Sequence, residues 1–273
     1  MNNYEKLEGM VAATFTPLDE NGDVNLSVID KYADWIASTP IKGIFVCGTT
    51  GEFSSLTIDE RKLILEKWLV SARKRFKVIA HVGSNCQRSA MELTRHAAQV
   101  GADAIASIAP SFFKPGTVDE LVDFFAPICH SAAGLPFYYY NMPSITGVNL
   151  PVDKFLVEGK KKIPNLVGTK FTHNNLMEMG VCIELEQHRF EVLHGYDEIL
   201  ISGLAMGAVA GVGSTYNYIP NVYQAIFDSM KMNDLETARH NQIKSIRTVE
   251  VIIKYGGGVR GGKAIMKLID IRY

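Results

Sequence analysis

A lysine near the end of an apolar segment is the residue in this sequence with the clearest chemical use. Lys170 lies in the run 166–171, with the sequence LVGTKF, which is typical of a buried strand. Burial disfavours the charged form of an ammonium group, and a neutral amine can attack a carbonyl carbon to give a Schiff base. The alternative is a lysine whose ammonium reaches solvent along its aliphatic chain, and this run alone leaves both interpretations open.

A second segment with chemical potential is 48–52, GTTGE, which follows the apolar run 43–47 and precedes a helical pattern. Its glycines bracket two hydroxyl side chains, Thr49 and Thr50. Backbone N–H groups and short hydroxyls in such a turn suit a carboxylate or a phosphate. The alternative is an ordinary turn between a strand and a helix, in which the threonines serve as caps.

A third segment, 137–143, reads FYYYNMP. Strand alternation places Tyr138 and Tyr140 on one face and Tyr139 on the other. Tyr140 is the last inward tyrosine before the turn, so its hydroxyl is expected at the C-terminal end of the strand. Tyr138 and Tyr139 are interpreted as core aromatics.

Composition restricts the function classes. The chain has 273 residues, of which 47% are hydrophobic, and a net charge of −1. Without a basic block, nucleic acid is not expected as a partner, and neither is a membrane, because no apolar stretch has spanning length. Residues 1–10 lack a signal-peptide core. The four cysteines are scattered without metal-ligand spacing, so we expect no metal, no cofactor and a cytoplasmic location.

The order of elements predicts a parallel barrel. Eight strands are expected at 9–14, 43–47, 77–82, 104–108, 137–141, 166–171, 190–194 and 211–213. A capping box, Thr57 with Glu60, opens the helix after the second strand. Further helices are expected at 89–100, 117–132, 149–158, 176–187, 198–206, 221–232 and 234–255. Alternating strands and helices over this length fit a TIM (β/α)8 barrel, and an open doubly wound sheet is the alternative.

The chain shows no linker that would divide it. We therefore expect a barrel over residues 1–233 and a short C-terminal helical extension over 234–273. The glycine-rich stretch 256–262 is interpreted as a flexible connection between terminal helices, because it lacks a phosphate-loop sequence and follows no strand. In a TIM barrel the C-terminal strand ends form the active site, which would bring Thr49, Thr50, Tyr140 and Lys170 to one mouth.

Taken together, these motifs resemble the dihydrodipicolinate synthase/N-acetylneuraminate lyase superfamily of Schiff-base aldolases. The resemblance rests on segments 48–52, 140–143 and 168–170 and spans nearly the whole chain. Two further segments, 195–198 (GYDE) and 213–217 (GSTYN), resemble the sialic-acid lyase branch. The synthases carry an arginine after the Tyr-Asn-x-Pro turn, where this chain has Ile145.

The resemblance implies cleavage of N-acetylneuraminate to pyruvate and N-acetylmannosamine. Lys170 would form the Schiff base and Tyr140 would transfer protons. Thr49 and Thr50 would bind the pyruvyl carboxylate. The remaining sugar-binding residues would be Thr172, Gly195, Asp197, Glu198, Gly213 and Ser214. Asp197 and Glu198 could instead cap the following helix.

Two features depart from the family pattern. The family's relay tyrosine after the fourth strand is replaced by Phe112 and Phe113. The resemblance implies a homotetramer, and we expect this aromatic pair either at a subunit contact or as a lid within its own chain. Family members continue beyond residue 273, which leaves a truncated chain or an unusually short C-terminal extension as alternatives.

Other functions remain open at this point. The nearest is another pyruvate-dependent aldolase, acting on 2-keto-3-deoxy sugar acids, and Asp197, Glu198 and Ser214 are the residues that discriminate against it. A catalytically silent sensor is disfavoured by the intact Lys170. A purely structural oligomer is disfavoured because the motifs converge on one mouth. No catalytic role is expected for His81 or for the chain's other histidines.

Overall fold

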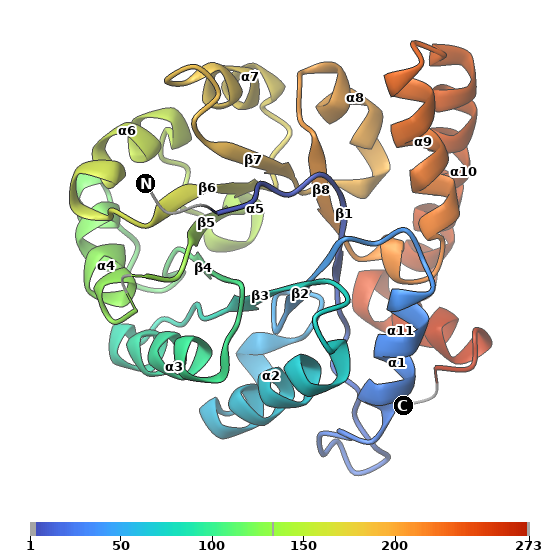
Figure 1. The fold of residues 1–273 in the computed structure, drawn as a ribbon, viewed down its shortest axis with the longest axis horizontal. Helices are drawn as coiled ribbons and strands as arrows, with labels where there is room; N and C mark the ends of the chain where they lie inside the picture. Colours follow the sequence, from blue (N-terminus) through green and yellow to red (C-terminus); the bar gives the residue numbers. More distant parts are fainter. Residues whose placement is uncertain (1–3, 133, 272–273) are drawn as a thin grey trace.

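Eight parallel strands form a closed barrel in a computed structural model of the chain, which describes residues 4–132 and 134–271 (Figure 1). Each strand pairs with its neighbour in sequence, and β1 pairs with β8. The strands are β1 Gly9–Ala13, β2 Gly43–Val46, β3 Lys77–His81, β4 Ala104–Ile108, β5 Phe137–Asn141, β6 Leu166–Phe171, β7 Glu191–His194 and β8 Ala210–Gly213. The predicted barrel and its eight strands are confirmed, with strand ends shifted by about one residue.

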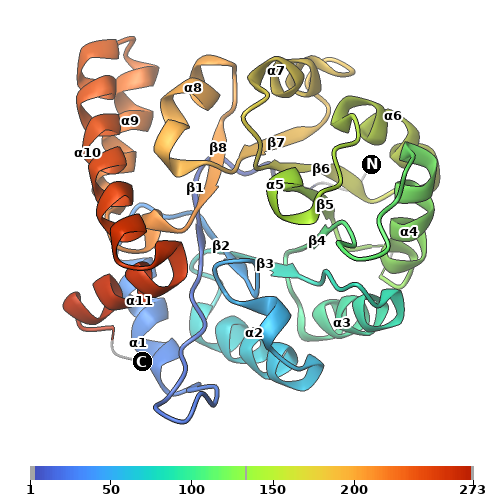
Figure 2. The same ribbon diagram turned by 180° about the vertical axis from the view of Figure 1, so that it is seen from behind.

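Helices surround the barrel in both views (Figures 1 and 2). They are α1 Val28–Ala37, α2 Ile58–Ala72, α3 Gln87–Val100, α4 Val118–His130, α5 Pro143–Thr146, α6 Val152–Lys162, α7 Leu176–Glu184, α8 Leu200–Ala205, α9 Pro220–Lys231, α10 Leu235–Lys254 and α11 Gly257–Leu268. The capping box at Thr57 is confirmed, since its hydroxyl accepts from the Glu60 N–H at 3.2 Å. Within the described residues, no helix is long and apolar enough to cross a membrane.

Several helix predictions differ from the structure. The sequence pattern did not single out α1 or α5. The helix expected at 149–158 begins only after Pro151, whose ring is accepted at a helix start. The helix expected at 176–187 ends at Glu184 because residues 186–188 adopt positive φ. Residues 197–199 form a 3₁₀ turn, and α8 starts after them.

Strand alternation sorts the tyrosines of β5 as predicted. Tyr138 and Tyr140 point into the barrel with residues such as Val11, Phe45 and Ile79. Tyr139 points outward, and its ring centroid lies 4.7 Å from that of Phe155 on α6. The inner face of β5 can therefore supply polar groups to both ends of the barrel.

The N-terminal segment closes the barrel where the strands begin. Glu191, 5% exposed, accepts from the Leu7 N–H at 2.6 Å and from the Tyr138 hydroxyl at 2.7 Å. Tyr4 completes this network, with its hydroxyl 2.8 Å from that of Tyr138. Burial raises the pKa of the Glu191 carboxyl. These contacts fill the barrel interior at the N-terminal ends of the strands, so an active site is expected at the C-terminal ends.

The glycine-rich stretch is not a flexible connection, and this interpretation was wrong. Gly256, at φ 98°, precedes α11, and Gly257–Gly262 belong to the helix. Close packing explains two of the glycines: a Cβ on Gly262 would lie 2.3 Å from Cζ of Phe15, and one on Gly261 would lie 2.8 Å from Ile252. The helix returns to the barrel beside α1 (Figures 1 and 2), where Lys31 pairs with Asp270.

Two glycines of α11 give a matched test of this packing. Gly262→Ala should destabilise the protein by about 1–3 kcal/mol, because the added methyl overlaps the buried Phe15 ring. Gly258→Ala should stabilise it by roughly 0.5–1 kcal/mol, because its site is open and alanine is the better helix former. Denaturant unfolding of both variants checks the pair. Equal effects would show that α11 is not packed against Phe15.

Candidate active site

Neighbouring strands bring an amine and a phenol together at the C-terminal end of the barrel. Tyr140 on β5 and Lys170 on β6 are register partners. Lys170 is 4% exposed, and its Nζ lies 4.0 Å from the ring centroid of Tyr140 and 4.3 Å from that of Phe45. The alternative of a lysine reaching solvent is therefore wrong. The amine is held in an aromatic slot, where π-faces attract a cation when it is protonated.

The loop after β2 places hydroxyl groups beside this slot. Thr49 Oγ1 lies 3.3 Å from the Tyr140 hydroxyl, which donates to Met142 Sδ at 3.0 Å. Thr50 follows in the same loop and is half-buried. Gly48 is required here because a Cβ would come within 2.7 Å of the Phe45 ring. Hydroxyls and a phenol beside a buried amine can bind a carboxylate and move protons around an imine.

A buried histidine supports the loop from the side. His81 Nδ1 lies 2.8 Å from the carbonyl oxygen of Cys47, the residue before the loop, and its ring centroid lies 5.9 Å from that of Tyr140. Burial, followed by the charges of Arg61 and Lys170, holds the pKa of His81 well below its usual value. Because its partner is a carbonyl oxygen, Nδ1 donates this hydrogen bond, which holds the start of the loop.

Arg61 also supports the site, although it belongs to none of the sequence motifs. It is 4% exposed and donates to the carbonyls of His81 at 2.7 Å and Gly83 at 2.9 Å. Burial lowers the pKa of its guanidinium. A signal was present, because Arg61 shares the apolar face of α2 with Leu65 and Trp68, where a charged residue is unexpected.

Thr172, after β6, lies in close contact with Gly195, after β7. Thr172 is 3% exposed, and its hydroxyl has no hydrogen-bond partner among the described residues. A Cβ on Gly195 would lie 1.9 Å from Thr172 Oγ1, so only glycine fits beside this side chain. A buried hydroxyl without a partner is available to a bound ligand.

The two carboxylates after β7 have different surroundings. Asp197 is 7% exposed, and its Oδ2 accepts from the Thr215 N–H at 2.8 Å and hydroxyl at 2.6 Å. The carboxylate therefore binds the loop after β8, while Asp197 and Glu198 also lie in the first turn of the 3₁₀ segment 197–199. Burial raises the pKa of Asp197. Burial and the neighbouring Asp197 charge raise the pKa of Glu198, which is half-buried.

The end of β8 is shaped around Asp197. A Cβ on Gly213 would lie 2.5 Å from the carboxyl carbon of Asp197. Ser214 follows, half-buried, and its carbonyl accepts from Asn217 Nδ2 at 2.7 Å. All ten predicted site residues thus lie at, or directly after, the C-terminal ends of β2, β5, β6, β7 and β8. In the described part of the chain, no group of three His, Cys, Asp or Glu side chains could hold a metal.

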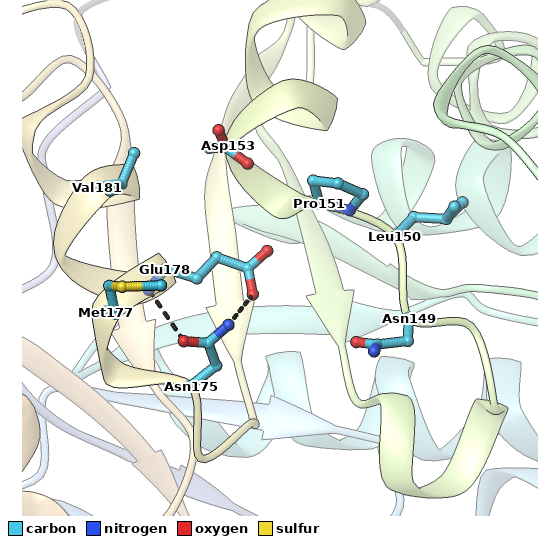
Figure 3. A pocket seen from close by; sticks show the side chains of 8 residues that line it. All are labelled: Asn149, Leu150, Pro151, Asp153, Asn175, Met177, Glu178 and Val181. Carbon is cyan, nitrogen blue, oxygen red and sulfur yellow. Dashed lines mark hydrogen bonds between the residues drawn. The ribbon is translucent and has the colours of Figure 1, made fainter.

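A surface cavity of about 390 Å³ lies elsewhere, at the starts of α6 and α7 (Figure 3). Two of its polar residues already have hydrogen-bond partners: Glu178 Oε1 accepts from the Val152 N–H at 2.7 Å, and Asn175 accepts from the Glu178 N–H at 3.2 Å. The ten site residues do not line it. We therefore place the candidate site at the barrel mouth.

The same fold recurs in proteins of known activity, along nearly the whole length of this chain. The profile of the dihydrodipicolinate synthetase family matches residues 6–273. N-acetylneuraminate lyase of Gallus gallus is 43% identical over 273 residues, covering 99% of this chain and 89% of that one. The Mus musculus lyase is 42% identical over 269 residues, covering 97% and 84%. The structure of the N-acetylneuraminate lyase (sialic acid aldolase) from Aliivibrio salmonicida superposes with a TM-score of 0.95 at 39% identity, covering 98% and 89%. This chain therefore belongs to the dihydrodipicolinate synthetase family.

Proposed function

We propose that this protein is a class I aldolase that cleaves N-acetylneuraminate to pyruvate and N-acetylmannosamine. One observation carries the proposal: the buried Lys170 amine lies against the ring of Tyr140, whose hydroxyl lies 3.3 Å from Thr49. The relatives named N-acetylneuraminate lyase, at 42–43% identity, support the substrate. The protein is thus an enzyme acting on a small molecule.

The reaction begins with the amine. Lys170 Nζ adds to the C2 ketone of the open-chain sugar acid, and loss of water leaves a protonated imine. The imine accepts the electron pair of the C3–C4 bond as that bond breaks, which gives an enamine and the aldehyde form of N-acetylmannosamine. The enamine carbon C3 then takes a proton, and water hydrolyses the imine to release pyruvate and the free amine.

Tyr140 carries the proton that bond cleavage requires. Cleavage converts the C4 hydroxyl to an aldehyde, so its proton must leave in the same step, and the C3 carbon later needs one back. The phenol on the strand next to Lys170 makes both transfers in this proposal, assisted by the charge of the imine. Thr49 and Thr50 bind the carboxylate through hydroxyl and backbone donors.

The sugar chain meets the loops after β6, β7 and β8. Thr172 contacts the C4 hydroxyl through its unpartnered buried oxygen. Asp197 and Glu198 accept hydrogen bonds from the hydroxyls of the sugar tail, and Gly195, Gly213 and Ser214 line its path. Ile145, 60% exposed after the Tyr-Asn-Met-Pro turn, provides no charge for a second carboxylate, which argues against the synthase reaction.

Trapping of the imine tests the function. Incubation with N-acetylneuraminate, or with pyruvate, and borohydride should attach one reduced pyruvate, a 1-carboxyethyl group, to the peptide that contains Lys170. Lys170→Ala should lose turnover and trapping. Tyr140→Phe is the matched variant: it should still trap pyruvate but lose on the order of 10²–10⁴ in cleavage rate. An adduct on another lysine would overturn the mechanism, and trapping with pyruvate but no cleavage of N-acetylneuraminate would favour another pyruvate aldolase.

Substrate class is tested at the two carboxylates. Asp197→Asn and Glu198→Gln should each raise KM for N-acetylneuraminate about tenfold or more, because hydrogen bonds to charged groups are the stronger ones. The amide that replaces the Asp197 carboxylate keeps an oxygen for Thr215, so the loop is preserved. The pyruvate concentration that half-saturates trapping should stay near the wild-type value. An equal loss of pyruvate binding would assign these carboxylates a structural role.

Assembly and organisation are further parts of the proposal. We place the barrel at residues 1–233 with an extension at 234–273, in a cytoplasmic homotetramer. Phe112 and Phe113 support assembly: they are 76% and 86% exposed, and their ring centroids are 5.0 Å apart. Such exposure is costly for a monomer. Light scattering should give four times the chain mass, and Phe112→Ser with Phe113→Ser should lower it. An active monomer would contradict the proposal.

A further inference from the structure

We propose that Lys263, on the C-terminal helix α11, is a positioning residue for the substrate carboxylate and acts through Glu52. This inference rests on the proposed aldolase function, because it concerns the loop 48–52 that carries Thr49 and Thr50. It gives one residue of α11, Lys263, a role in positioning the loop, while the helix also covers the barrel.

The first contact is an ion pair between Lys263 Nζ and Glu52 Oε1. The two side chains are only 18% and 28% exposed, so solvent screens them less than it screens a surface pair. Glu52 has φ 57°, a left-handed conformation that is uncommon for a residue other than glycine. Such a conformation persists where surrounding contacts fix it, and the ion pair is one of these contacts.

The backbone of Glu52 connects this pair to the loop. Its N–H donates to the carbonyl of Thr49 at 3.0 Å, and the next N–H, of Phe53, donates to the carbonyl of Gly48 at 3.3 Å. A rotation of Glu52 would therefore move Thr49 directly. The pull of Lys263 on the Glu52 carboxylate is thus transmitted through two backbone hydrogen bonds to the residues that would bind the substrate.

A second contact runs through the neighbouring residue of α11. Gly262 packs against Phe15 so closely that no Cβ would fit. Thr16, next to Phe15, donates from its hydroxyl to the carbonyl of Gly51 at 2.7 Å. Consecutive residues of α11 therefore reach the loop by two routes, one ionic and one by packing. The glycine-rich sequence thus has a function: it lets the helix approach closely enough for Lys263 to reach Glu52.

The inference predicts a defect in carboxylate binding. Lys263→Met and Glu52→Gln should each raise the pyruvate concentration that half-saturates borohydride trapping by roughly ten- to a hundredfold, as expected for small displacements of binding groups. The KM for N-acetylneuraminate should rise in parallel, while kcat should change much less. Lys267→Met is the matched control, because Lys267 lies on the same helix and is exposed. It should behave as wild type.

Reversal of the pair separates positioning from stability. Glu52→Lys combined with Lys263→Glu should recover most of the lost pyruvate affinity, whereas each single reversal should not. If Lys263→Met fails to fold, the double reversal decides: a folded double variant without recovery overturns the proposal. Lys263→Met with wild-type pyruvate affinity also overturns it. If the wild-type protein traps no pyruvate, the aldolase function fails instead.

Discussion

Burial of the Lys170 amine is the constraint on which the rest of the structure depends. A buried ammonium is costly, so the surroundings must either neutralise it or provide compensating contacts. The barrel does this with the aromatic faces of Phe45 and Tyr140, contributed by β2 and β5. The same placement removes the amine from competition with water and brings it beside the phenol. One geometric arrangement therefore places a buried amine and a phenol side by side, as the proposed reaction requires.

The opposite end of the barrel, where the strands begin, is filled by the Glu191 network. The Glu191 network ties the N-terminal segment to β5 and β7, and Tyr138 shares that strand with Tyr140. The inner face of β5 thus has a tyrosine bound to Glu191 near its start and the tyrosine of the proposed reaction near its end. The hydrogen bond from Tyr138 to Glu191 limits how far β5 can shift, and this helps to fix the Tyr140 hydroxyl relative to Lys170.

The loops at the mouth are held by residues that do not contact the reacting atoms. Cys47 and Glu52, with φ 54° and 57°, bracket the loop 48–51. His81 donates to the carbonyl of Cys47, and Lys263 pairs with the side chain of Glu52.

The segment after β7 is held by α10. Gln242 of α10 donates to the Asp197 carbonyl at 3.0 Å and accepts from the Ile201 N–H at 2.8 Å. Helix α10 thus contacts the segment after β7, and α11 contacts the loop after β2.

The sequence by itself determined the alternation of strands and helices and the residues at the strand ends. Apolar periodicity is local, and parallel strands must place their C-terminal ends on one side, so Lys170, Tyr140 and Thr49 could be grouped before any contact was known. Only the tertiary structure decided which distant groups support them. Asp197 binds Thr215, Arg61 binds the end of β3, and residues 257–262 before Lys263 are helical. The physical reason is that glycine has a low intrinsic preference for helix, so a glycine-rich segment is expected to form a loop. Close packing against Phe15 and Ile252 stabilises the helix instead, and only residues without a side chain fit at these contacts.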